Sequence, residues 1–105
     1  MIARIWHGMT AAAKADAYLK YLEASGIKEY RRTEGNRGVY VLRRVVSDRA
    51  HFLLVSLWES LEAIRLFAGS DFESAVYFPC DREFLLEFEP TVTHYDVLLA
   101  PESVP

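Results

Sequence analysis

The sequence predicts an α+β fold, with strands and helices in the order β-α-β-β-α-β. Three observations support this order. Runs of β-branched and aromatic residues occur near both ends and twice in the middle of the chain. Apolar residues follow a helical spacing between some of these runs, and Gly, Ser, Asp and Pro residues separate them. A chain of 105 residues is expected to form one domain.

The first strand is predicted over Ile2–His7, where Gly8 would break it. Thr10 is a suitable N-cap for a helix that runs to about Ser25. Gly26 is expected to end this helix, because a left-handed C′ position costs glycine little. The helix would bury one face through the i, i+3, i+4, i+7 positions Ala15, Tyr18, Leu19 and Leu22.

The second and third strands are predicted over Val39–Val46 and Ala50–Trp58, and a short turn between them indicates a hairpin. The charged stretch Lys28–Arg37 before them carries turn residues near its end. These two strands are therefore expected to pair with each other in the middle of the sequence.

Ser60 is expected to cap a second helix, Leu61–Ala68. A short helical turn near residues 71–76 and a third short helix, Arg82–Glu87, would follow. The last strand is predicted over Thr91–Leu99. Residues 2–98 would thus make the structured core of a domain spanning residues 1–105, with Ala100–Pro105 as a loose tail.

This order is that of the split βαβ, or ferredoxin-like, subunit. Right-handed crossovers would place the first and third strands in the middle of a four-stranded antiparallel sheet. Both main helices would then lie on one face of the sheet, and the other face would carry no helix.

The third strand is apolar on both faces. One face carries Phe52, Leu54, Ser56 and Trp58, and the other carries Leu53, Val55 and Leu57. Because the helices can cover only one face, we expect a homodimer whose interface is the helix-free face. The alternative is that the C-terminal segment folds back over that face.

Composition excludes several classes of protein. Twelve Lys and Arg residues against fifteen Asp and Glu residues give a net charge of −3, which does not favour nucleic-acid binding. The single Cys80 excludes an internal disulfide and a Cys-rich zinc site, and the three histidines show no compact ligand spacing. We expect no metal, no membrane span and, from a free thiol without an export signal, a cytoplasmic location.

The run Leu57-Trp-Glu-Ser-Leu-Glu-Ala-Ile, followed by Ser70-Asp-Phe, resembles the antibiotic biosynthesis monooxygenase family. The resemblance extends from Ile2 to about Leu98. It implies a subunit that pairs into a dimeric α+β barrel. The family includes quinone-forming monooxygenases that use no metal or flavin, haem-degrading enzymes and autoinducer-processing enzymes.

The haem-degrading branch has an Asn at the end of its first strand, a Trp late in its second helix and a His in the following turn. In this chain those positions fall on His7, Phe67 and Tyr77. The resemblance therefore points away from haem degradation. A Tyr77 phenolate is the remaining alternative for a haem ligand.

The candidate site follows from the fold that the resemblance implies. We expect a cavity of a few hundred Å³ between the sheet and the helices. His7 would act as general base, because imidazole titrates near neutral pH, and Tyr77 would orient a substrate or donate a proton. Trp58 would stack on an aromatic substrate. The remaining walls would be Ile5, Phe67 and Phe72.

Arg4 and Trp6 are expected on the partner-facing side of the first strand. A buried arginine needs a carboxylate, which Asp96 or Glu59 could supply. Arg44 shares a strand face with Tyr40 and could hold an oxyanion or form an exposed salt bridge.

Two classes of function remain open. The first is a cofactor-independent monooxygenase that acts on a small aromatic or phenolic compound. The second is a non-catalytic small-ligand-binding or stress-response protein that uses the same pocket. Haem binding or degradation is a third alternative.

Overall fold

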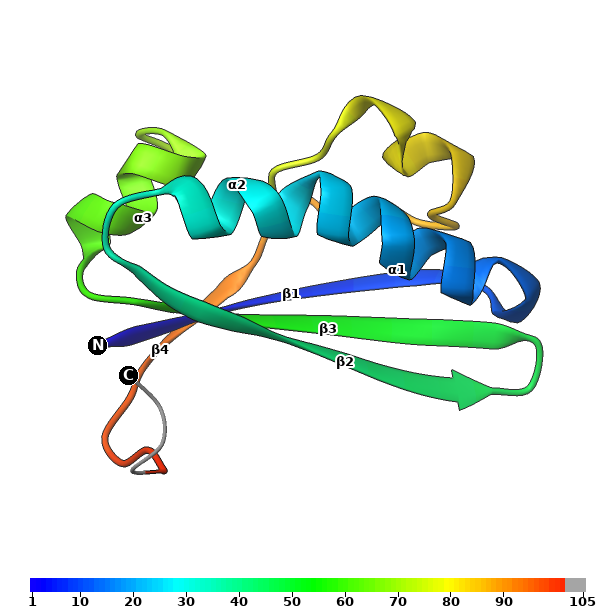
Figure 1. The fold of residues 1–105 in the computed structure, drawn as a ribbon, viewed down its shortest axis with the longest axis horizontal. Coiled ribbons are helices and arrows are strands. Elements are labelled where there is room, and N and C mark those ends of the chain that lie inside the picture. The colour runs from blue at the N-terminus through cyan, green and yellow to red at the C-terminus, as the bar shows by residue number, and fades with distance from the viewer. Residues whose placement is uncertain (102–105) are drawn as a thin grey trace.

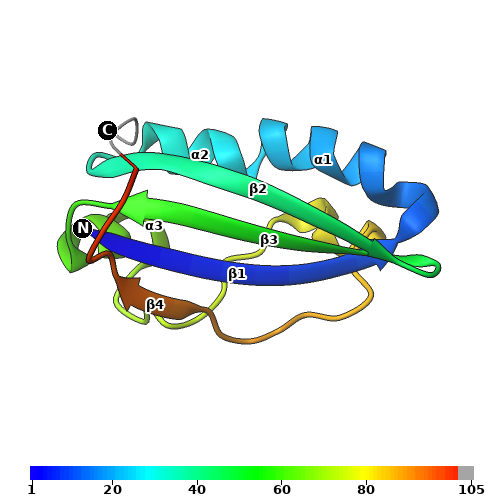
Figure 2. The same cartoon turned by 90° about the horizontal axis from the view of Figure 1, so that it is seen from below.

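The computed structural model describes residues 1–101, which form a helical layer on one face of a four-stranded antiparallel sheet (Figure 1). The strands are β1 Ile2–Ala11, β2 Asn36–Val46, β3 Arg49–Trp58 and β4 Thr93–Asp96, in the spatial order β2-β3-β1-β4. Figure 2 looks onto the face of the sheet that carries no helix. The predicted ferredoxin-like architecture, with the first and third strands in the middle, is confirmed.

The helices are α1 Ala15–Ala24, α2 Gly26–Arg32 and α3 Leu61–Ala68, with 3-10 turns η1 Ala12–Lys14 and η2 Pro79–Glu83. The bounds of α3 are those predicted. Its cap is also confirmed, because the Ser60 hydroxyl accepts a hydrogen bond from the Ala63 N–H at 3.2 Å.

The prediction that Gly8 ends the first strand was wrong. β1 continues to Ala11, and Thr10, expected as a helix cap, is a fully buried strand residue opposite Ala50. The indole of Trp6 occupies the space beside Gly8, where an added Cβ would stand 2.0 Å from the ring. Gly8 therefore makes room for a core side chain within a continuous strand.

The predicted helix up to Ser25 is also different. α1 ends at Ala24, Ser25 leaves the helical conformation, and Gly26 begins α2 instead of ending α1. The next residues are helical because Ile27 and Tyr30, at i and i+3, give the charged stretch an apolar face.

Residues 69–92, here called the cover segment, pass over the helix-side face of the sheet and then run back along the free edge of β1 (Figures 1 and 2). They contain one regular element, η2. The predicted helical turn near residues 71–76 is absent, and η2 takes the place of the predicted helix Arg82–Glu87. β4 is shorter than the predicted Thr91–Leu99. Residues 102–105 of the predicted tail lie outside the described residues.

The core lies between the sheet and the helices. Trp6, Phe52, Leu54 and Trp58 from β1 and β3 pack against Tyr18, Leu22, Ile27 and Tyr30 from α1 and α2. Because side chains alternate along β1, this places Arg4 and Trp6 beneath the helices and Ile5 and His7 on the helix-free face. The predicted facing of β1 was therefore wrong. The bulky Trp6 points to the helices, which we had expected to cover His7.

Candidate functional site

The structure separates the predicted site residues. His7 and Ile5 lie on the helix-free face of β1, whereas Trp58 lies in the helix-side core. Trp58 is 0% exposed, and its indole N–H donates to Ser56 Oγ at 2.9 Å. A sealed side chain offers no surface on which a substrate could stack.

Phe67 and Phe72 also belong to the helix side. The Phe67 ring lies 5.7 Å from the Arg4 guanidinium carbon and packs against Trp58 and Tyr30. The Phe72 ring meets His94 edge-on at 5.5 Å. The Phe67 ring therefore covers Arg4, and neither ring shares a face with His7.

Tyr77 lies at the edge of β1, in the cover segment. Its hydroxyl donates to the Glu89 carbonyl at 2.5 Å and accepts from Trp6 Nε1 at 3.3 Å. Burial raises the pKa of the Tyr77 hydroxyl, which keeps it a neutral donor at physiological pH. These contacts make Tyr77 a residue that fixes Glu89 in place.

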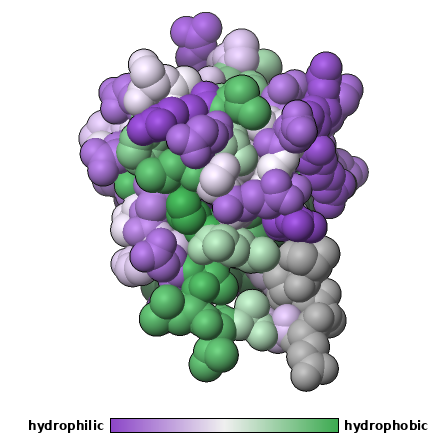
Figure 3. Space-filling view, turned by 90° about the vertical axis from the view of Figure 1, so that its left-hand side faces the viewer, coloured by the Kyte–Doolittle hydropathy of each residue, from purple (hydrophilic) through white to green (hydrophobic). Residues whose placement is uncertain are grey.

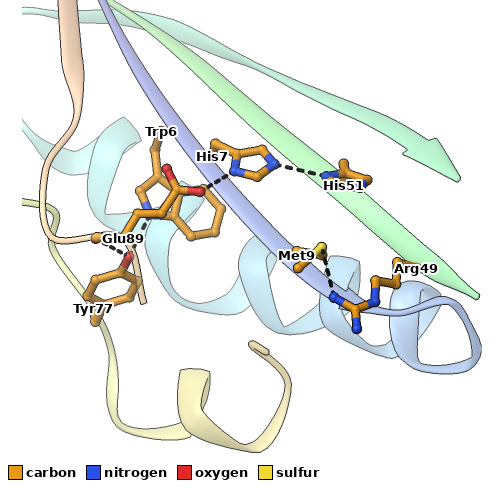
Figure 4. A network of polar contacts seen from close by, with 7 residues as sticks. All are labelled: Trp6, His7, Met9, Arg49, His51, Tyr77 and Glu89. Atoms are coloured by element: carbon orange, nitrogen blue, oxygen red, sulfur yellow. Dashed lines mark hydrogen bonds and ion pairs between the residues drawn. The ribbon is translucent and has the colours of Figure 1, made fainter. Parts of the chain in front are cut away.

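Glu89, His7 and His51 form a hydrogen-bonded chain (Figure 4). The Glu89 carboxylate contacts His7 Nδ1, and His7 Nε2 lies 3.0 Å from His51 Nδ1. The two imidazoles are stacked with their centroids 5.3 Å apart. About a third of the His7 side chain is exposed, so these hydrogen-bonded side chains reach the surface of the protein.

Sequence reasoning had found His7 but missed Glu89 and His51. His51 reaches His7 because β1 and β3 pair with His7 opposite Leu53, which places His51 diagonally across from His7 on the same face. No local pattern encodes that long-range register. Glu89 belongs to an irregular segment, which gives no periodic signal.

The two histidines line a surface pocket of about 400 Å³ on the sheet, here called the outer pocket. Arg44, on β2, stands directly opposite His51 in the strand register, so its side chain shares the helix-free face. Within residues 1–101, Arg44 forms no ion pair. The full lining is His7, Leu42, Arg43, Arg44, Val46, His51, Phe52 and Leu53.

The cavity between sheet and helices, here called the inner cavity, has a volume of only about 20 Å³. This is room for about one water molecule, so the prediction of a few hundred Å³ on this side was wrong. Trp6, Tyr18, Tyr30, Val76 and Phe78 fill the space that we had expected a ligand to occupy.

Two further observations bear on the class of protein. Within residues 1–101, no three His, Cys, Asp or Glu side chains come together in a way that could hold a metal ion. None of the helices described here has the length and apolar character needed to cross a membrane.

Solved structures share this fold. A Nitrosomonas europaea protein provisionally assigned as an antibiotic biosynthesis monooxygenase superposes with a TM-score of 0.64 at 15% identity, covering 94% of this chain and 100% of its own. MhuD, a haem-degrading protein of Mycobacterium tuberculosis with two haems in its active site, gives 0.58 at 20%, covering 96% and 99%. Rv0793 from the same organism gives 0.55 at 18%, covering 97% and 98%.

No protein-family model and no curated protein matches the sequence. The fold is thus that of the antibiotic biosynthesis monooxygenase-like α+β proteins. The resemblance seen in the sequence is confirmed at the level of the fold.

Proposed function

We propose that this protein is an enzyme that deprotonates a small phenolic compound and allows dioxygen to oxidise it without a metal or flavin. The observation that carries the proposal is the Glu89–His7–His51 chain on the wall of the outer pocket. The fold, shared with monooxygenase-like proteins, supports the choice of oxidation over other base-catalysed reactions.

The Glu89–His7–His51 hydrogen bonds determine which imidazole nitrogen can accept a proton from a substrate. An ionised Glu89 accepts a hydrogen bond from His7 Nδ1–H, which leaves His7 Nε2 as an acceptor in the neutral ring. His51 Nδ1–H then donates to His7 Nε2, so His51 Nε2 keeps a free lone pair. A proton taken up at His51 Nε2 creates positive charge that the chain can share with Glu89.

The same pocket can hold the substrate. Leu42 and Leu53 offer apolar surface to a ring, and Arg44 offers a cation to the phenolate that deprotonation creates. The balanced reaction converts one ring C–H and one O–H into two C=O groups. One oxygen atom of O₂ enters the ring and the other leaves as water.

We also propose that a second copy of the chain covers the helix-free face. Tyr40, Leu42 and Val46 on β2 and Tyr95 on β4 are between 44% and 58% exposed there. Leu98 and Leu99, which follow β4 in the sequence, are 88% and 94% exposed. The segment after β4 extends away from the sheet on the side opposite the helices (Figure 1). Figure 3 views the molecule from the left-hand side of Figure 1 and shows hydrophobic residues gathered in its lower part, which is the helix-free side. Exposed apolar surface of this extent favours association, which would also wall off the outer pocket from water.

Haem, which the structural relative MhuD holds in its active site, does not fit the residues of this chain. The inner cavity admits about one water molecule, and both hydrogen-bonding roles of the Tyr77 hydroxyl are occupied. On the helix side, His94 Nε2 accepts a hydrogen bond from Arg4 Nη1 at 3.2 Å, so this imidazole nitrogen already has a partner. The proposed reaction therefore involves no haem.

Oxygen uptake and product mass, measured with a panel of hydroquinones and naphthols, test the proposal. The wild type should consume one O₂ for each quinone formed. His51→Gln and His7→Ala should each lower turnover by roughly 10²–10⁴-fold, the usual contribution of a general base.

Glu89→Gln and Glu87→Gln form a matched pair. Glu87 is an exposed neighbour without an ion pair in residues 1–101, so only Glu89→Gln should slow turnover. Saturable binding of these compounds without oxygen uptake would contradict the enzymatic proposal and favour a non-catalytic ligand-binding protein.

A further inference from the structure

We infer that the outer pocket selects phenols that carry a carboxylate on the same side of the ring as the hydroxyl. The inference rests on the proposed function, because it takes this pocket as the substrate site, and it adds the class of substrate. Three features carry it: arginines on both sides of His51, the lack of acidic residues on the strands of the pocket, and a boundary between apolar and cationic surface within it.

The strand register places two arginines beside His51. Arg44 stands directly opposite His51 on β2, and neighbouring strands lie about 4.8 Å apart. Arg49 precedes His51 by two residues on β3, so both side chains leave the same face of the sheet. The Arg49 side chain reaches towards β1, where its Nη1 lies 4.0 Å from Sδ of Met9, the residue opposite His51 (Figure 4). His51 therefore lies between an arginine of β2 and a guanidinium that reaches β1.

Neither guanidinium is neutralised by a short ion pair. Arg44 is exposed and forms no ion pair within residues 1–101. Arg49 Nε lies 4.0 Å from Asp48 Oδ1, whose side chain is 93% exposed, so water weakens this contact. β1, β2 and β3 contain no Asp or Glu, and Glu89 of the cover segment is held by His7. The pocket therefore has two positive charges that its own carboxylates do not balance.

A phenolate supplies one of the two negative charges that these arginines can accept. When the proposed base takes the phenol proton, the phenolate is stabilised by Arg44, which leaves Arg49 available. Guanidinium binds a carboxylate through two parallel N–H···O bonds, whereas Met9 Sδ is a weak acceptor that is easily replaced. A substrate that carries both a phenol and a carboxylate thus matches the charge of the pocket better than a neutral phenol does.

The pocket also determines how such a substrate lies. Leu42 and Leu53 oppose each other in the strand register, and the next pair on the same face, towards the hairpin, is Arg44 and His51. A ring that rests on the two leucines therefore has its cationic neighbours along one side. Ortho and meta isomers place the hydroxyl and the carboxylate together on that side. A para isomer directs one of the two groups away from the arginines, over apolar surface where it has no partner.

The experiment measures binding by calorimetry without oxygen, so that the result does not depend on turnover. The probe is 3-hydroxybenzoate, 3-hydroxybenzamide is its uncharged isostere, and 4-hydroxybenzoate is an isomer of the same charge. The wild type should bind 3-hydroxybenzoate at least about tenfold more tightly than the amide, and more tightly than the para isomer. Equal affinity for the acid and the amide, equal affinity for the two isomers, or no binding of 3-hydroxybenzoate would each overturn the inference.

Arginine variants test the two charges one at a time. Arg44→Gln and Arg49→Gln should each remove most of the preference for the acid over the amide, and both residues are exposed, so the fold should tolerate the changes. Arg37→Gln is the matched control, because Arg37 also belongs to β2 but pairs with Glu59 at 2.9 Å. It should leave the preference unchanged. A preference that persists in Arg44→Gln or in Arg49→Gln would refute the assignment.

The three histidines locate the bound ligand. In NMR spectra of the imidazole protons, 3-hydroxybenzoate should shift the signals of His7 and His51 and leave His94, on the helix side, unchanged. A shift of His94 alone would place the ligand on the other face and refute the inference.

Oxygen uptake with the same compounds separates this inference from the proposed reaction. Uptake with neutral phenols, without a preference for the acid in binding, would contradict the inference and leave the reaction standing. Preferential binding of the acid without uptake would support the selectivity of the pocket and contradict the reaction.

Discussion

The packing of Trp6 over Gly8 predicts a large loss of stability for Gly8→Ala. An added Cβ would stand 2.0, 2.5 and 2.8 Å from three atoms of the indole ring, distances that no side chain tolerates without movement. The ring is buried in the core and donates a hydrogen bond to Tyr77, so it has little room to move. Overpacking of this kind costs about 1–3 kcal/mol.

A cost of about 2 kcal/mol corresponds to a fall in Tm of roughly 8–16 °C for a domain of this size. Thermal unfolding followed by circular dichroism measures it. Gly26→Ala is the matched control, because its Cβ would meet only Phe78 Cε2, at an ordinary 3.5 Å, at the start of a helix. Its stability should change by less than about 1 kcal/mol.

The clash itself can be isolated with the double variant Gly8→Ala/Trp6→Leu. Trp6→Leu alone removes the ring and should destabilise. Adding Gly8→Ala to it should then cost little, because the indole is gone. A Gly8→Ala protein as stable as the wild type would show that the ring does not lie over Gly8 and would refute this account of β1.

The remaining predictions concern association and pH. Tyr40→Glu, which places a charge on the exposed helix-free face, should shift the protein from dimer to monomer in sedimentation experiments, whereas Glu62→Gln on α3 should not. Burial raises the pKa of Asp81, so the folded state favours the protonated acid. Its contribution to stability is present below the unfolded-state pKa, near 3.8, and is lost as pH rises through the higher folded-state pKa. The stability of the wild type relative to Asp81→Asn should therefore fall as pH rises above about 4 in denaturant titrations, and a constant difference would contradict this assignment.

The order of elements could be predicted because it depends on local signals, and the order of strands then follows from right-handed crossovers. The Ser60 cap, the apolar spacing of Leu61–Ala68 and the hairpin between β2 and β3 are all encoded within a few neighbouring residues. The break at Ser25 was missed because Gly26 fits a C′ position and an early helix position equally well in sequence.

The facing of β1 could not be predicted from its own residues. Ala3 and Ile5 on one side, and Trp6 on the other, are all apolar, so alternation gives no preference. The choice depends on which face the helices cover, and that is a tertiary property. The candidate site was therefore predicted in part: His7 was found, but its partners came from a distant strand and from an irregular segment.

The two faces of β1 nevertheless remain physically connected. Arg4 and Trp6 point into the inner cavity, and His7, one residue further, points to the outer pocket. The cover segment joins them, because Tyr77 accepts from Trp6 and donates to the Glu89 carbonyl, while the Glu89 carboxylate holds His7. A shift of the cover segment would therefore also move Glu89, the partner of the proposed base. The cover segment thus ties the packing of the helix-side core to the position of the proposed base on the other face.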